Sequence, residues 1–251
     1  PLILTLYMAK FFKEYCDATG RTLPYTLRVL MGCSEETGMT DVDYYLDREP
    51  MPAFLFTPDA NFPVGYGEKG GFGGTFESAR LSGNLVDFTD GLRDTAHVKV
   101  AAEGDGLIRV TGYGIGGHAS TPAGTVNAIA LVVDYLMENK LCTPEEEHYL
   151  AMLQTLLATT DGRSVGIACR DEMFDALTCI GGTITMEDGV LRQTIDVRYP
   201  TAISGEELTA ACKLLAETGG AKFIPGRCSE PFYISPDSAE VAVLMDAYRT
   251  V

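Results

Sequence analysis

An almost entirely apolar run at residues 26–31, which leads within a few residues to the acidic pair Glu35 and Glu36, most constrains the fold of this chain. Such a run without polar alternation is typical of a strand covered on both faces, as in an α/β sheet. Open α/β sheets bind ligands beyond the carboxyl ends of their strands, where Glu35 would lie. Because neighbouring side chains on extended backbone point to opposite sides, one carboxylate can face a metal ion and the other a water molecule. The alternative for a bare acidic pair is a solvated turn.

A second short apolar run, residues 53–56, predicts a buried strand that ends at Pro58 and Asp59. Two strand ends would thus bring three carboxylates together. Taken alone, an aspartate that follows a proline is a turn former. A helix is predicted before the first strand, because apolar residues recur at spacings of three and four across residues 2–16 and Gly20 follows as a stop.

Six glycines in the ten residues 65–74 mark a change in composition. Glycine-rich segments are flexible, so a hinge or a crossing between domains is predicted here. The Gly-Lys-Ser/Thr sequence of a phosphate-binding loop is absent. A helix predicted from Ser238 onward would return the chain to the first domain, which makes the intervening domain an insertion.

The inserted segment, from about residue 70 to residue 230, carries the pattern of an α+β domain. Residues 107–110 predict a strand, and residues 187–189 (EDG), between two apolar runs, predict a hairpin turn. Thr143 and Ser204 each begin a capping box and therefore a helix. Strand pairs crossed by two helices predict a two-layer sandwich. A further helix is predicted to bury one face, made of Ala128, Ile129, Val132, Val133 and Leu136.

Composition excludes several classes of partner. The formal net charge of −16 argues against nucleic acid and anionic membranes, because both bind surfaces rich in Lys and Arg. No stretch reaches the roughly eighteen consecutive apolar residues of a membrane helix, and no signal peptide is recognised. Seven cysteines without a Cys-x-x-Cys pair are typical of reduced thiols, which predicts a cytoplasmic protein.

Two residues of the inserted segment are candidates for a binding site. His118 lies in the loop sequence GGHASTP at residues 116–122, whose small neighbours leave the imidazole uncovered. The alternative is a histidine that is merely solvated. Arg198 is predicted to lie on a strand, where it could pair with Asp196, face solvent, or bind a carboxylate through two parallel hydrogen bonds.

Three motifs together resemble the M20 family of metallopeptidases, in particular its dipeptidase branch. They are EETGM at 35–39, TPDANFPV at 57–64 followed by GEKG at 67–70, and GGHASTP at 116–122. The resemblance implies an α/β catalytic domain, partly present as residues 1–69 and 231–251, and an inserted α+β two-layer lid domain at residues 70–230. The chain is similar to about the middle of the family and is expected to be incomplete at both ends.

The resemblance also implies a role for each candidate. Glu35 would be the general base of amide hydrolysis, while Glu36 and Asp59 would each bind one metal ion. His118 would hydrogen-bond the scissile carbonyl oxygen as negative charge builds on it. Arg198 would bind the free carboxylate of the substrate. The implied cofactors are two zinc ions, with manganese or cobalt as alternatives, and the implied partner is a small peptide, bound by a monomer.

Departures from the family bear on activity. The family takes further metal ligands from histidines near both ends of its sequence, whereas no histidine here precedes His97 and none follows His148. The family's Asn-x-Val-Pro segment is also missing between residues 88 and 100, and Asn84 is a poor substitute. We therefore expect these residues alone to be an inactive part of a dipeptidase. The alternatives are an N-acyl amino acid deacylase or desuccinylase of the same family, and a non-catalytic binding module that retains the lid.

Overall fold

The computed structural model describes residues 2–34, 39–59, 62–85, 88 and 97–250. The chain divides into two compact units, unit 1 (Pro1–Tyr66 with Ile234–Val251) and unit 2 (Gly67–Tyr233). In chain order the elements are α1 (Leu2–Thr19), α2 (Thr40–Leu46), β1 (Gly67–Glu68), β2 (Gly70–Glu77), β3 (His97–Gly104), β4 (Leu107–Tyr113), α3 (Ala128–Glu138), α4 (Pro144–Leu157), the short 3-10 helix η2 (Arg163–Val165), β5 (Arg170–Asp171), β6 (Asp175–Ala176), β7 (Thr178–Glu187), β8 (Val190–Tyr199), α5 (Gly205–Thr218), β9 (Lys222–Ser229), β10 (Phe232–Tyr233) and α6 (Ala239–Arg249).

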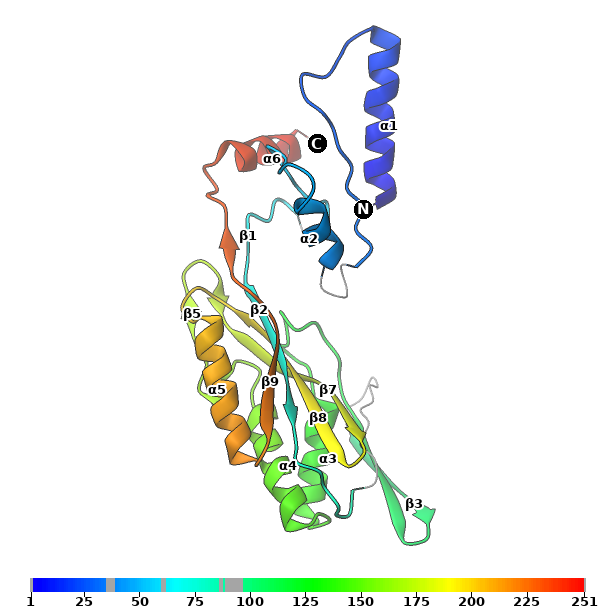
Figure 1. The fold of residues 1–251 in the computed structure, drawn as a ribbon, viewed down its shortest axis with the longest axis vertical. Coiled ribbons are helices and arrows are strands. Elements are labelled where there is room, and N and C mark those ends of the chain that lie inside the picture. Colours follow the sequence, from blue (N-terminus) through cyan, green and yellow to red (C-terminus); the bar gives the residue numbers. More distant parts are fainter. Residues whose placement is uncertain (1, 35–38, 60–61, 86–87, 89–96, 251) are drawn as a thin grey trace. The chain divides into compact units, whose positions relative to one another are not determined.

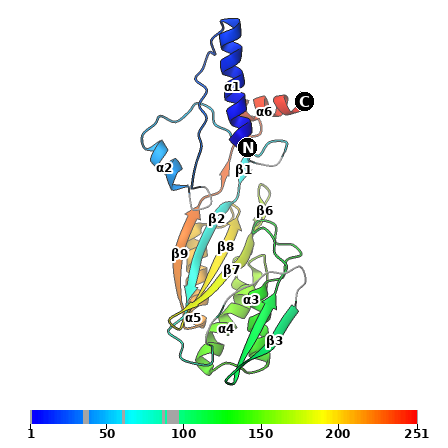
Figure 2. The same cartoon turned by 90° about the vertical axis from the view of Figure 1, so that its right-hand side faces the viewer.

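Unit 2 is built on an antiparallel sheet of four strands in the order β7-β8-β2-β9. Helices α3, α4 and α5 lie on one side of this sheet (Figures 1 and 2). Along β8 every second residue from Leu191 to Tyr199 is buried, and the apolar ones among them share one core with the helices. The alternate residues from Arg192 to Arg198 are only half-buried, because they project from the opposite, open face of the sheet.

The local signals in unit 2 are confirmed. The five buried residues of α3 are those predicted from their spacing. Thr143 and Ser204 are the N-caps of α4 and α5, and each closes a capping box with the glutamate three residues on. The turn between β7 and β8 falls at Asp188 and Gly189, which both have positive φ. The strand predicted at residues 107–110 lies within β4.

The glycine-rich segment was predicted to be a hinge or a crossing between domains. The boundary between the two units falls inside it, between Tyr66 and Gly67, but a hinge is wrong for residues 70–74. They form the first part of β2, an interior strand paired with both β8 and β9. The glycines allow close packing across the sheet: a β-carbon on Gly70 would stand 2.5 Å from the ring of Tyr199, and one on Gly74 would overlap the ring of Phe223. Composition alone cannot distinguish a flexible glycine from one that makes room for a neighbouring ring.

Three pairs of strands complete unit 2. Strands β3 and β4 form a hairpin that packs beside α3, while β1 pairs with β10 and β5 pairs with β6, all antiparallel. Most residues of β3 are exposed, so the side chains of this strand do not form a second core. The main core of the unit therefore lies between the four-stranded sheet and its helices.

In unit 1 the described residues form helices α1, α2 and α6 and no strand. The strands predicted at residues 26–31 and 53–56 are wrong, since both segments are irregular there. A strand needs a hydrogen-bonded neighbour, and neither segment pairs with another described part of the chain. Apolar side chains of both segments are exposed to solvent: Met31 is 56% exposed and Leu55 is 69% exposed. Val241 is the one buried apolar side chain among the described residues of this unit.

The first helix is confirmed by α1, and Gly20 ends it with a positive φ while its N–H bonds the carbonyl of Cys16. The helix from Ser238 is also confirmed, because the Ser238 hydroxyl caps α6. None of the residues of α1 is buried. Among the described residues, no helical segment combines the length and the apolar character that a membrane crossing requires.

Candidate functional site

The acidic pair Glu35 and Glu36 lies outside the described residues, but the backbone that leads to it is held by Asp41. The Asp41 carboxylate accepts hydrogen bonds from the N–H of Cys33 at 2.5 Å and from the hydroxyl of Ser34 at 2.5 Å. These bonds, first that of the Ser34 side chain and then that of the Cys33 backbone, hold the pKa of Asp41 well below its usual range. Asp41 therefore fixes the residues just before the acidic pair.

Asp59 is exposed in an irregular segment of unit 1. Its backbone N–H approaches the hydroxyl of Thr57 at 3.4 Å, a long contact. Among the residues that the structure describes, no three His, Cys, Asp or Glu side chains come together as a metal site. Zinc sites take three or four protein ligands. Glu36, one of the two predicted ligands, lies outside the described residues, so the zinc pair stays a prediction.

His118 lies in unit 2, in an exposed loop that is closed at its base. Ile115 and Val126 pair across the loop through two backbone hydrogen bonds of 2.9 and 3.0 Å. Asn127, which follows the loop, caps α3 with its side-chain oxygen and donates from its amide nitrogen to the carbonyl of Gly181 on β7 at 2.9 Å. A short bridge and one asparagine thus anchor the histidine loop between α3 and the sheet.

The hydrogen bonds of His118 define its tautomer. The backbone N–H of Ser120 donates to Nδ1 at 3.2 Å, and the Ser120 hydroxyl lies 2.7 Å from the same nitrogen. Because a backbone N–H can only donate, Nδ1 is an acceptor, and a neutral imidazole must carry its proton on Nε2. His118 therefore presents an N–H donor at the far side of an exposed ring, which suits it to a carbonyl oxygen that gains negative charge.

Arg198 lies on the open face of the sheet, near the end of β8. Its neighbours in register are Thr178 on β7 and Gly71 on β2. The guanidinium donates from Nε and Nη2 to the two carboxylate oxygens of Asp196, at 3.0 and 3.2 Å. The pairing with Asp196 that the sequence left open is thus present, and the side chain still keeps about a third of its surface exposed.

The candidates are divided between the two units. His118 and Arg198 both belong to unit 2, and both are attached to β7, through Asn127 and through pairing with Thr178. Asp59 belongs to unit 1. Sequence reasoning missed the supporting residues Asp41 and Ser120, because no motif spacing links an aspartate or a serine to the side chain it orients.

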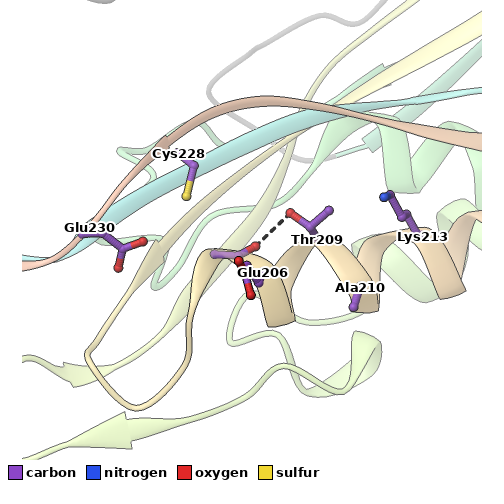
Figure 3. A pocket seen from close by; sticks show the side chains of 7 residues that line it. Glu206, Thr209, Ala210, Lys213, Cys228 and Glu230 are labelled. Atoms are coloured by element: carbon purple, nitrogen blue, oxygen red, sulfur yellow. Dashed lines mark hydrogen bonds between the residues drawn. The ribbon is translucent and has the colours of Figure 1, made fainter.

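A hollow of about 440 Å³ lies elsewhere in unit 2, between the start of α5 and the end of β9. Figure 3 shows Glu206, Thr209 and Lys213 along the helix, opposite Cys228 and Glu230. Thr209 donates to the carbonyl of Gly205 and is therefore already satisfied. Two carboxylates against a single lysine make this hollow unfavourable for the carboxylate of a peptide. It contains none of the residues predicted to form a site.

No model of a known protein family matches the chain. The chain is 25% identical to "Putative dipeptidase YtjP" of Bacillus subtilis over an alignment 289 residues long, which covers 99% of this chain and 60% of that protein. A protein of Staphylococcus epidermidis with a similar description is 24% identical over the same shares. The Beta-Ala-Xaa dipeptidase of Lactobacillus delbrueckii subsp. lactis is 25% identical over 88% of this chain and 54% of its own length. The chain thus spans 54 to 60% of the length of these relatives, and their dipeptidase names suggest a peptidase family.

Proposed function

We propose that this protein hydrolyses the amide bond of dipeptides or short peptides with a free carboxyl terminus. The observation that carries the proposal is that relatives named dipeptidases align with 99% of the chain. The name of the Lactobacillus relative makes β-alanyl dipeptides the first substrates to test.

The geometry of unit 2 supports this proposal. Arg198 offers a planar cation on an open sheet face, suited to the terminal carboxylate of a peptide. His118 offers an Nε2–H donor in an exposed loop, suited to the scissile carbonyl oxygen. A peptide that carries both an amide carbonyl and a carboxylate provides one partner for each group.

In the proposed reaction, water adds to the carbonyl carbon and the carbon–nitrogen bond breaks. Glu35 removes a proton from the attacking water and later delivers it to the leaving amine. His118 donates a hydrogen bond to the carbonyl oxygen while it carries negative charge, and releases it when the new carboxylate forms. Arg198 holds the carboxyl end of the substrate throughout.

The finer assignment rests on the sequence motifs. We propose the M20 dipeptidase branch, an α/β catalytic domain with an inserted lid, and a pair of zinc ions to which Glu36 and Asp59 contribute one ligand each. Bound zinc would supply an activated water and polarise the carbonyl.

The proposal is tested on the full-length protein that contains this sequence. Matched pairs of substrates, a dipeptide and its C-terminal amide, are compared for wild type, Arg198→Ala and the control Arg192→Ala. Arg192 lies on the same face of β8 and pairs with Glu77. We expect Arg198→Ala to raise KM for the free carboxylate about tenfold or more, which corresponds to loss of one charge-assisted contact, and to leave the amide unchanged.

Two outcomes would redirect the proposal. Faster turnover of N-acyl amino acids than of dipeptides would identify a deacylase that uses the same residues. The absence of turnover on both classes, together with retained peptide binding, would identify a non-catalytic binding module.

A further inference from the structure

Arg198 lies beside Gly71 on the open face of the sheet, where the glycine has no side chain to cover the neighbouring groups. The two residues are directly opposite each other on β8 and β2, and Ser229 on β9 is opposite Gly71 on its other side. A β-carbon on Gly71 would stand 3.7 Å from Nη1 of Arg198 and 3.1 Å from the hydroxyl of Ser229. The missing side chain therefore leaves a narrow space between a cation and a hydroxyl, in which even a β-carbon would be in tight contact with the hydroxyl.

The contact with Asp196 uses only one edge of the guanidinium. Nε and Nη2 donate to the two oxygens of Asp196, in the parallel arrangement typical of arginine and carboxylate. Nη1 has no acceptor in the described part of the chain, and its two N–H groups are thus open to a ligand. The guanidinium is planar, so fixing Nε and Nη2 on Asp196 also fixes the direction of the two N–H groups of Nη1.

The hydroxyl of Ser229 can serve as a second donor. Its oxygen accepts from the N–H of Gly71 at 3.1 Å, while its own hydrogen points to the carbonyl of Gly71 over a long 3.4 Å. A contact of that length is weak and easily exchanged for a better acceptor. A carboxylate placed over Gly71 would be such an acceptor.

We propose that Asp196 is a positioning residue that fixes Arg198 with Nη1 over Gly71, and that Nη1 and the Ser229 hydroxyl together bind a ligand carboxylate in the space that Gly71 leaves. The identity of the ligand, a peptide with a free terminal carboxylate, rests on the proposed function. Gly71 then determines specificity, because any side chain there would fill the place of the carboxylate. Asp196 acts through Arg198 and does not touch the ligand.

The test measures binding directly, so that it does not depend on hydrolysis. The 251-residue chain is labelled with [15N]arginine, and the Nε–H signal of Arg198 is assigned as the one lost in Arg198→Lys. N-acetylglycine is titrated as the carboxylate probe and N-acetylglycinamide as the neutral probe. We expect the Arg198 signal to shift with the first probe and not with the second.

Three variants separate the parts of the proposal. Asp196→Asn should speed hydrogen exchange at the Arg198 Nε–H and weaken N-acetylglycine binding, each by about tenfold, because a charge-assisted bond is lost. Gly71→Ala should abolish the shift. Gly73→Ala is the matched control: it adds the same methyl group to the same strand and face, where the nearest atom is the carbonyl oxygen of Ile195 at 3.3 Å, and should bind like wild type.

Several results would overturn the inference: unchanged binding in Gly71→Ala, unchanged exchange and binding in Asp196→Asn, or a shift of equal size with both probes. Asp196 and Arg198 project from the open face, so their substitution leaves the core intact and keeps the test valid even if Gly71→Ala does not fold. If the carboxylate binds as expected but the full-length protein hydrolyses no peptide, the proposed function fails and the positioning role of Asp196 stands.

Discussion

The buried carboxylate of Glu146 accepts a hydrogen bond of 2.6 Å from the backbone N–H of Leu85, a residue 61 positions earlier in the chain. Its other oxygen accepts from the N–H of Thr143 at 2.7 Å and closes the capping box of α4. Burial alone would raise the pKa of Glu146, but the backbone hydrogen bonds of Leu85 and Thr143 outweigh it, so the pKa is lowered. One ionised side chain thus connects the segment after β2 to the start of a core helix.

We expect Glu146→Gln to lower the free energy of unfolding by about 1–3 kcal/mol at pH 7, because the amide group turns one buried acceptor into a donor that faces another donor. The folded-state pKa is depressed, so this stabilisation is present above the unfolded carboxyl pKa of about 4.3 and is lost as pH falls through the folded pKa. The difference between the two proteins should therefore shrink in acid. Urea unfolding at pH 7 and at acid pH measures it.

The control for this prediction is Glu207→Gln. Glu207 has the same place in the capping box of α5, but it is exposed, and within the described part of the chain its carboxylate accepts hydrogen bonds only from Ser204. Glu207→Gln should therefore lower the free energy of unfolding by less than Glu146→Gln does. Equal losses in the two variants would show that the cap, and not the buried bond to Leu85, accounts for the effect.

The sequence predicted those parts of unit 2 that depend on local chemistry. The capping boxes at Thr143 and Ser204, the turn at Asp188 and the buried face of α3 each follow from residues within one helical turn or one hairpin. Segments that depend on distant partners were predicted wrongly. Residues 26–31 have the composition of a strand but no described neighbour to pair with, and Gly70 and Gly74 of β2 are explained by the rings of Tyr199 and Phe223.

In the candidate site, too, the sequence identified individual residues better than the contacts that orient them. The motifs singled out His118 and Arg198, and the sequence left pairing with Asp196 open as one of three alternatives for Arg198, but it did not single out Ser120. The proton on Nε2 of His118 follows from the Ser120 backbone, and the direction of the Arg198 guanidinium follows from Asp196. These contacts are geometric properties of a loop and of a sheet face, so they require coordinates.

His118→Ala in the full-length protein should lower kcat by about 10²–10³, because a donor to the developing oxyanion is removed. The zinc content of the variant should equal that of wild type, since this role does not involve a metal. The matched control is His148→Ala, which removes an exposed histidine from α4 and should leave kcat unchanged. Loss of bound metal in His118→Ala would assign the histidine a different role.

The neighbours Glu35 and Glu36 should respond differently to the same change. In the full-length protein, Glu35→Gln should abolish turnover and leave the metal content nearly intact, because a general base is removed without a ligand. Glu36→Gln should lower the metal content itself. Elemental analysis of both purified variants, beside a kinetic assay, decides between the roles, and equal metal loss in both would overturn the assignment.

The 251 residues of this sequence contain three histidines, His97, His118 and His148. A zinc site of a hydrolase takes about three protein ligands and one water, and the motifs assign only Glu36 and Asp59 to metal. Two carboxylates cannot hold two zinc ions, and without the cations they repel each other. We therefore expect this chain by itself to retain less than one zinc ion after dialysis and to hydrolyse no dipeptide above background. Zinc analysis and a dipeptide assay with added zinc or manganese test this. Robust metal-dependent turnover that Glu35→Gln abolishes would show that other residues of these 251 complete the site.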